Sequence, residues 1–103
     1  MFRIQLSSEA ARDRDRLFDY LRQFSAEAAE YHVARLDQEL EGLADGLVAW
    51  NFFFVTGAPY HAKLFKISRQ RQLWIVYRID QDEKIIRILR IWDTRQNPLA
   101  FKL

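Results

Sequence analysis

The hydrophobic pattern of the chain changes once, near Gly46, and this change limits the folds that the chain can adopt. Between Ser25 and Leu47 the apolar residues recur every three or four positions, which is the period of a helix. Beyond Gly46, apolar and β-branched residues alternate or run together in short stretches between polar turns, as in strands. This order predicts an α+β domain in which the helices precede most of the sheet.

The first half of the chain is expected to hold one short strand and two helices. The strand FRIQL spans residues 2–6, and Ser7 or Ser8 can cap a helix that ends near Phe24. The apolar residues that share one face of this helix are Ala11, Leu17, Phe18, Leu21 and Phe24. Ser25 can cap a second helix, whose periodic apolar positions are Ala29, Val33, Leu36, Leu40, Leu43 and Leu47. Together the two helices form a hairpin that should cover one face of a sheet.

The second half reads as strands. An extended piece is expected at residues 52–55, followed by a turn at Gly57–Pro59 and a strand at residues 62–68. Two further strands, LWIVYRI at residues 73–79 and KIIRILRIW at residues 84–92, are joined by DQDE, which has the composition of a hairpin turn. The predicted sheet is therefore antiparallel and twisted.

The DQDE turn also predicts which side chains share a face of the hairpin. If Ile79 lies opposite Lys84, the face toward the helices carries Leu73, Ile75, Tyr77, Ile79, Ile86 and Ile88, with Arg90 and Trp92 near its end. The other face then carries Trp74, Val76, Arg78, Ile85, Arg87, Leu89 and Ile91. Arg78 and Arg87 are diagonal neighbours in this register, a like-charge pair that needs solvent or an anion. A slip of one residue would exchange the faces.

Composition limits the chemistry. The 103 residues suffice for one domain, expected to span residues 1–103, and they include no cysteine, which excludes disulfides, thiolate catalysis and cysteine-ligated metals. Up to Tyr60 there are 6 Lys and Arg against 10 Asp and Glu, whereas from His61 onward there are 10 against 4. A basic second half suits phosphate or an acidic partner. Solvated surface charge is the alternative. The sequence shows no secretory or membrane segment, so we expect a cytoplasmic protein.

Few residues are candidates for catalysis. His32 and His61 are separated and lack a cluster of further ligands, so neither a metal nor another cofactor is expected. Tyr60, His61, Lys63 and Lys66 could form a nuclease site, although their spacing is not diagnostic.

With this order of elements and this distribution of charge, the chain resembles the RelE/ParE superfamily of toxins from bacterial toxin–antitoxin modules. The resemblance covers essentially the whole chain and rests on SSEAARDRDRLFDYL near the start, on the Tyr77-Arg78 strand, and on the basic last strand with its exit DTRQNP. It implies the toxin of a type II toxin–antitoxin pair, with a cognate antitoxin as partner. A homodimer and a toxin–antitoxin hetero-oligomer both remain open.

The resemblance is compatible with two activities. RelE-like toxins cut messenger RNA on the ribosome with basic and tyrosine or histidine side chains, whereas ParE-like toxins inhibit DNA gyrase. This chain has Trp74 where RelE-like toxins tend to have arginine, and Phe101 where they often have a general base. Phenylalanine cannot transfer a proton. The ParE-like, non-enzymatic interpretation is therefore favoured. A RelE-like nuclease and a non-toxic nucleic-acid-binding or adaptor domain are the alternatives.

The residues of the expected sites follow from these two interpretations. The residues that we expect to bind the target or the antitoxin are Trp74, Arg78, Arg87, Arg90 and Arg95. If the protein is a nuclease, the candidates are instead Tyr60, His61, Lys63, Lys66 and Arg95.

Overall fold

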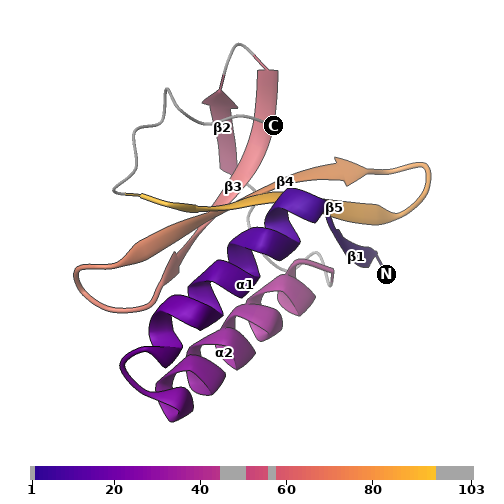
Figure 1. The fold of residues 1–103 in the computed structure, drawn as a ribbon. Helices are drawn as coiled ribbons and strands as arrows, with labels where there is room; N and C mark the ends of the chain where they lie inside the picture. The colour runs from indigo at the N-terminus through magenta and orange to yellow at the C-terminus, as the bar shows by residue number, and fades with distance from the viewer. Residues whose placement is uncertain (1, 45–50, 56–57, 95–103) are drawn as a thin grey trace.

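The computed structural model of the chain describes residues 2–44, 51–55 and 58–94, with side chains for residues 2–44 and 61–94. In this part of the chain, two helices lie side by side against one face of a five-stranded sheet (Figure 1). The elements are β1 (Arg3–Leu6), α1 (Ser8–Arg22), α2 (Ala26–Ala44), β2 (Asn51–Val55), β3 (Ala58–Lys66), β4 (Gln72–Asp80) and β5 (Ile85–Asp93). The predicted α+β class, with a helical hairpin on one face of a sheet, is confirmed.

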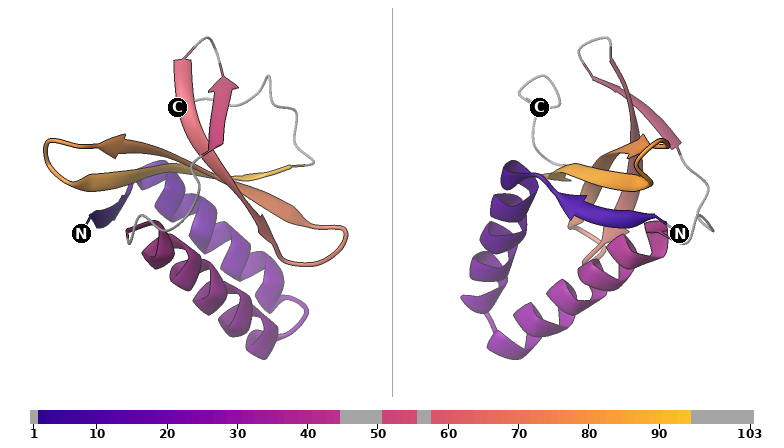
Figure 2. Two further views of the ribbon diagram at one scale, coloured as in Figure 1. Left: turned by 180° about the vertical axis from the view of Figure 1, so that it is seen from behind. Right: turned by 90° about the vertical axis from the view of Figure 1, so that its right-hand side faces the viewer.

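The sheet has the strand order β1-β5-β4-β3-β2. Strands β2 to β5 form an antiparallel series, whereas β1 pairs with β5 in parallel, so that the first strand lies beside the last (Figure 2). The sheet is therefore mixed, a feature that the alternation within each strand did not reveal. β1 covers only the first half of β5, from Ile85 to Ile88, so that among the described residues the second half of β5 has no strand neighbour on that side.

Ser7 fixes the turn from β1 into α1. Its side-chain oxygen accepts a hydrogen bond from the Ala10 N–H at 3.0 Å, which confirms Ser7 as the N-cap of α1. The same hydroxyl donates to the Leu89 carbonyl at 2.9 Å, and the Ser7 N–H donates to the Ile88 carbonyl at 2.8 Å. The start of α1 is thus attached to β5 at the point where β1 ends.

The first helix ends earlier than predicted, at Arg22 instead of Phe24. Phe24 lies in the turn between the helices, and its N–H bonds to the Leu21 carbonyl at 3.0 Å. Ser25 accepts from the Ala28 N–H at 3.2 Å, consistent with its predicted role as the cap of α2. Because the chain turns at this point, the Phe24 side chain leaves the apolar face and is 72% exposed, so its predicted place on that face was wrong.

The core lies between the helical hairpin and the sheet. Both helices and strands β3 to β5 supply its buried residues, which are Ala10, Leu17, Leu36, Leu40, Leu43, Phe65, Leu73, Ile75, Tyr77, Ile86, Ile88 and Ile91. Ala29 and Val33 of α2 are also buried, as their period predicted, whereas Leu47 lies outside the described residues. Burial of these side chains provides the main driving force for packing the helices on the sheet.

The third strand begins earlier and ends earlier than predicted, at residues 58–66 instead of 62–68. The turn signal at Gly57–Pro59 suggested that the strand would begin only after it. Pro59 instead pairs with Phe54 at the beginning of the β2–β3 hairpin. Proline is tolerated near the start of a strand, because few ladder bonds there need its missing N–H.

The register of β4 and β5 differs from the prediction. Ile79 lies opposite Ile86, not Lys84, and this shift by two residues leaves the faces unchanged near the turn. Between Val76 and Tyr77 the pairing jumps, because Leu89 is an extra, bulged residue of β5. Beyond this bulge the predicted faces of the β5 residues were wrong: Ile91 lies opposite Ile75 in the core, and Arg90 lies opposite Val76.

Candidate functional site

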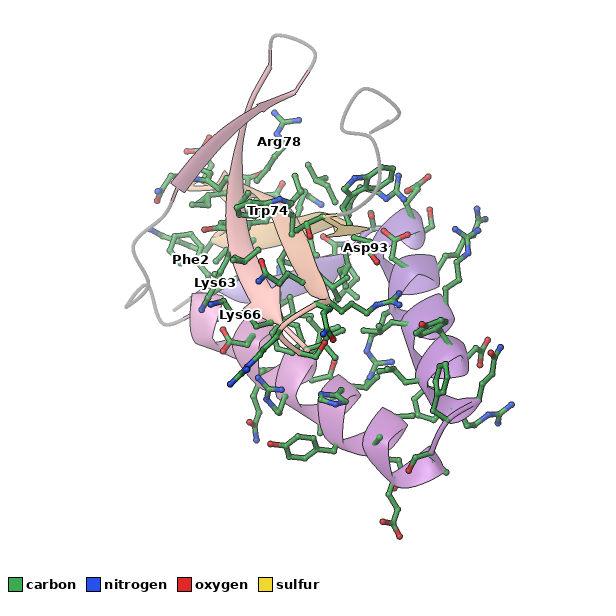
Figure 3. The ribbon with its side chains drawn as sticks, turned by 90° about the vertical axis from the view of Figure 1, so that its left-hand side faces the viewer. Phe2, Lys63, Lys66, Trp74, Arg78 and Asp93 are labelled. Atoms are coloured by element: carbon green, nitrogen blue, oxygen red, sulfur yellow. The ribbon has the colours of Figure 1, made fainter. Side chains whose placement is uncertain are left out.

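Two cations stand side by side at the β4–β5 end of the sheet. Arg78 and Arg87 are direct partners in the ladder, closer than the predicted diagonal arrangement. Directly opposed like charges are destabilising unless solvent or counter-charges separate them. Arg78 is exposed and extends away from the helical hairpin (Figure 3), and residues 2–44 and 61–94 include no ion-pair partner for it. This guanidinium is available to an anionic ligand.

Arg87 is held only loosely by its neighbours. It donates to Gln5 of β1 at 2.7 Å, while its contacts with Glu83 and Asp80 are longer, at 3.5 and 3.9 Å. The side chains of Arg87 and Glu83 remain 41% and 62% exposed. Asp80 also stabilises the β4–β5 turn, since its carboxylate accepts hydrogen bonds from the N–H groups of Asp82 and Glu83 at 3.1 Å each. A stronger anion could displace these contacts.

The outer edge of β1 adjoins this cation pair, because Gln5 links it to Arg87. Within the described residues β1 is an edge strand, with β5 as its only strand neighbour. The N–H groups of Arg3 and Ser7 donate inward to Lys84 and Ile88, both at 2.8 Å. Since successive residues of a strand direct these groups to opposite sides, those of Ile4 point outward. Such an edge can accept a strand from another chain.

A groove of about 750 Å³ runs along this edge between β1 and α2. Phe2, Ile4 and Ala44 supply its apolar lining, and its charged lining residues are Arg3, Asp37 and Glu41. Gly42 also lines the groove, and a Cβ at this position would meet no atom of the described residues within 4 Å. As far as these residues form it, the groove is open above α2, with room for side chains of an added segment.

Arg90 is held quite differently from Arg78. Its guanidinium donates to both oxygens of Asp13 of α1, at 2.7 and 3.1 Å, and one of these oxygens also accepts the Ile91 N–H at 2.9 Å. The Arg90 guanidinium also lies 4.7 Å from the centre of the Trp92 ring. The side chains of Arg90 and Asp13 are only 15% and 8% exposed. Asp13 thereby accepts a backbone hydrogen bond from the part of β5 that does not pair with β1.

The candidate nuclease residues do not share one face. His61 lies opposite Tyr77, and their rings stack with centroids 5.4 Å apart on the helix-facing side. Lys63 is also on this side, where its ammonium pairs with Glu39 of α2. Lys66 is exposed and alternates with the core residue Phe65, so it belongs to the other side. Figure 3 shows Lys63 and Lys66 along β3.

The remaining predicted site residues fall into two groups. Trp74 lies opposite Leu64 and Trp92, on the face away from the core. Tyr60 is a residue of β3, but its side chain lies outside the described part of the structure, as do Arg95 and Phe101 entirely. Among the described residues, no group of three or more histidine, aspartate or glutamate side chains could hold a metal ion.

Burial perturbs two groups near this region. Tyr77 is fully buried, and desolvation of its hydroxyl raises the pKa to about 12. This hydroxyl has no hydrogen-bond partner in the described part of the chain. Burial and the Arg35 cation lower the pKa of His32, whose Nδ1 lies 3.4 Å from the Arg35 guanidinium. A tyrosine with such a high pKa is a poor proton donor at neutral pH.

Comparison with known proteins gives one match. Residues 4–98 match the family model of the ParE toxin of the type II toxin–antitoxin system, parDE. The chain belongs to the ParE toxin family. This ParE-family protein is therefore a toxin of the type II toxin–antitoxin class. No curated protein and no solved structure matches the chain.

Several features of this ParE-family toxin escaped the sequence analysis. The edge groove depends on the parallel pairing of β1 with β5, and the Arg90–Asp13 pair joins residues 77 positions apart. The charge pattern of α1 could have suggested that one of its acidic residues pairs with the basic last strand, but not which one. Within the described residues, neither helix is long and apolar enough to cross a membrane.

Proposed function

We propose that this ParE-family toxin arrests growth by inhibiting DNA gyrase, without cutting messenger RNA, and that a cognate antitoxin neutralises it in the cytoplasm. The observation that carries the proposal is the separation of the candidate acid and base groups. His61 and Lys63 face the helices, whereas Lys66 and Trp74 belong to the other side of the sheet. Cutting RNA requires a base and an acid on the same ribose and phosphate.

Two further observations support the non-nuclease mechanism. Lys63 is paired with Glu39, so its charge is already matched within the fold. Tyr77, the tyrosine of the WIVY strand, is buried and its pKa lies far above neutrality. Neither group is suited to move a proton of the 2′-hydroxyl or the leaving oxygen.

We infer that the antitoxin binds at the β1 edge and the neighbouring Arg78–Arg87 pair. An extended segment can bond to the outward backbone groups of β1, with alternate side chains entering the groove beside Gly42. Its other side chains would lie near Arg3 and Arg87 and are expected to be acidic, since each of these cations is accessible. A disordered acidic segment gains both burial and charge neutralisation there.

The test is a supercoiling and DNA-cleavage assay with purified gyrase and purified toxin. We expect inhibition of supercoiling and accumulation of gyrase–DNA breaks. Ribosomes programmed with messenger RNA, incubated with the same preparation, should show no codon-specific cuts. Cuts without an effect on gyrase would favour the RelE-like alternative. A folded protein that affects neither gyrase nor RNA, and that is harmless when overexpressed, would favour the non-toxic domain.

Gly42 provides a matched pair of variants for the antitoxin surface. Gly42→Ala should leave binding intact and stabilise α2 by up to about 1 kcal/mol, because glycine is a poor helix former. Gly42→Trp should fill the groove and weaken antitoxin binding, while gyrase inhibition persists. Equal antitoxin affinities of the two variants would place the antitoxin elsewhere.

A further inference from the structure

A second surface lies at the opposite end of the molecule from the β1 edge. The turn between α1 and α2 and the turn between β3 and β4 both lie toward this end, whereas the β4–β5 turn lies at the other (Figures 1 and 2). β4 connects the two ends with nine residues, a separation of roughly 26 Å at the usual rise of a strand. A segment confined to the β1 edge therefore leaves this second surface uncovered.

Exposed aromatic rings mark the second surface. Phe24 is 72% exposed and Tyr20 is 40% exposed, and their rings meet edge to face with centroids 5.3 Å apart. Large aromatic side chains at this exposure are unfavourable in water. Tyrosine, phenylalanine and arginine are the types enriched at the centres of protein interfaces.

Arg71 holds Tyr20 in place. Its guanidinium lies 4.0 Å from the centre of the Tyr20 ring and 3.4 Å from the Asp93 carboxylate. The backbone of Arg71 is fixed in the β3–β4 turn, where its carbonyl accepts the N–H groups of Ile67 and Ser68 at 3.0 and 3.1 Å. Groups ordered before binding lose less entropy when a partner arrives.

A cleft of about 250 Å³ opens beside these rings, between α1 and the ends of β4 and β5. Its apolar lining comes from Leu17, Leu73 and Ile91, and Tyr20 forms part of its wall. The cleft is large enough for one apolar side chain of a partner. Burial of that side chain together with the exposed rings would favour association.

The charges of the cleft favour an acidic partner. Three arginines line it against two aspartates, and these aspartates are already matched by Arg71 and Arg90. Arg16 is the third arginine, and the described part of the chain offers it no ion-pair partner. A carboxylate of a partner would supply the ion pair that Arg16 lacks among the described residues.

We propose that Phe24, Tyr20, Arg16 and Arg71 form the surface through which the toxin docks on its protein target, against an acidic segment that inserts an apolar side chain into the cleft. This inference rests on the proposed function, since the target is taken to be gyrase. It separates the toxin into two surfaces: the β1 edge for the antitoxin and this aromatic surface for the target.

The test compares Phe24→Ser and Arg16→Glu with wild type, and uses Tyr31→Ala as the control. Tyr31 is also an exposed aromatic residue of the helical hairpin, at 62%, but its ring contacts His32 and Arg35 of α2, whereas the Phe24 ring contacts Tyr20 in the wall of the cleft. Binding of purified gyrase should weaken about tenfold or more for Phe24→Ser, as for the truncation of a central interface residue. The loss for Arg16→Glu should shrink as salt is raised from about 50 to 300 mM.

Controls for folding and for DNA make the outcomes decisive. All three variants should melt within about 3 °C of wild type, because the changed side chains are exposed. If wild type inhibits gyrase and both Phe24→Ser and Arg16→Glu bind it equally well, the docking surface is wrong and the proposed function stands. If wild type does not bind gyrase, both proposals fail. If the two variants instead lose affinity for a short DNA duplex that wild type binds, the surface recognises phosphate and the inference is overturned.

Discussion

Arg87 and Arg90 lie three residues apart on β5, in two regions where the arginine side chain has different roles. Arg87, at the β4–β5 end, is 41% exposed and contacts its acidic neighbours at 3.5 and 3.9 Å. Arg90, at the junction with α1, is 15% exposed and bonds to both oxygens of Asp13. A largely buried charge that is bonded to both oxygens of a carboxylate is part of the fold, whereas a loosely held one can change partner. The difference arises from the end of β1, which leaves β5 open to Asp13.

The largest effect is expected from breaking the Arg90–Asp13 pair. Asp13→Ala would leave a mostly buried guanidinium without its carboxylate and the Ile91 N–H without its acceptor. We expect the free energy of unfolding to fall by about 3 kcal/mol, measured by urea denaturation. Asp15→Ala, at an exposed position of the same helix, is the control and should change stability by less than about 0.5 kcal/mol.

The double variant Asp13→Ala/Arg90→Met sharpens this prediction. It removes both charges and keeps an apolar side chain of similar length, so part of the lost stability should return. No recovery would mean that the bond from Asp13 to the Ile91 N–H, and not the ion pair, accounts for most of the effect.

The next largest effect on stability is expected from the ionisation of Tyr77, which is buried beside His61. Its pKa is about 12 in the folded protein and near 10 in the unfolded chain, so above pH 10 the unfolded state loses this proton first. Below pH 10 both states keep the proton, so the free energy of unfolding does not change with pH through this group. As the pH rises from 10 to 12, the free energy of unfolding falls by up to about 2.7 kcal/mol. Denaturation at pH 8 and pH 11 should therefore show a smaller decrease for Tyr77→Phe than for wild type.

The smallest effect on stability is expected at the β4–β5 end. Arg78→Ala should change the free energy of unfolding by less than about 0.5 kcal/mol, and Arg87→Ala, which loses the bond to Gln5, by about 1 kcal/mol or less. Both should weaken binding of the antitoxin, with a loss that decreases at high salt. Unfolding of either variant would show that this region resembles the Arg90 junction and would remove the contrast between them.

The hydrophobic period of the sequence predicted the elements and the helix-facing residues near the β4–β5 turn, because a period of two or of three to four residues is local information. It misplaced Ile91 and Arg90, since the bulge at Leu89 lies where β5 is attached to Ser7 and Asp13. It also placed Phe24 on the apolar face of the first helix, although the turn into α2 directs this ring outward. These errors share one cause, the long-range contacts that periodicity does not encode.

The candidate site was predictable in part. The exposed pair Arg78 and Arg87 followed from alternation, whereas Trp74 and Phe101 favoured a non-nuclease interpretation that stays a prediction. The β1 groove required the parallel pairing of the first and last strands, which join residues about 80 positions apart. The aromatic surface required the end of α1 to meet the β3–β4 turn.

The proposed function is tested most directly by primer extension on transcripts from bacteria in which the toxin is induced, with a DNA-damage reporter read in the same culture. We expect growth arrest, a DNA-damage response and no codon-specific cuts. His61→Ala and Lys66→Ala should remain toxic, because no acid or base chemistry depends on them. Cuts at defined codons that disappear when His61 or Lys66 is replaced, without a DNA-damage response, would contradict the central claim.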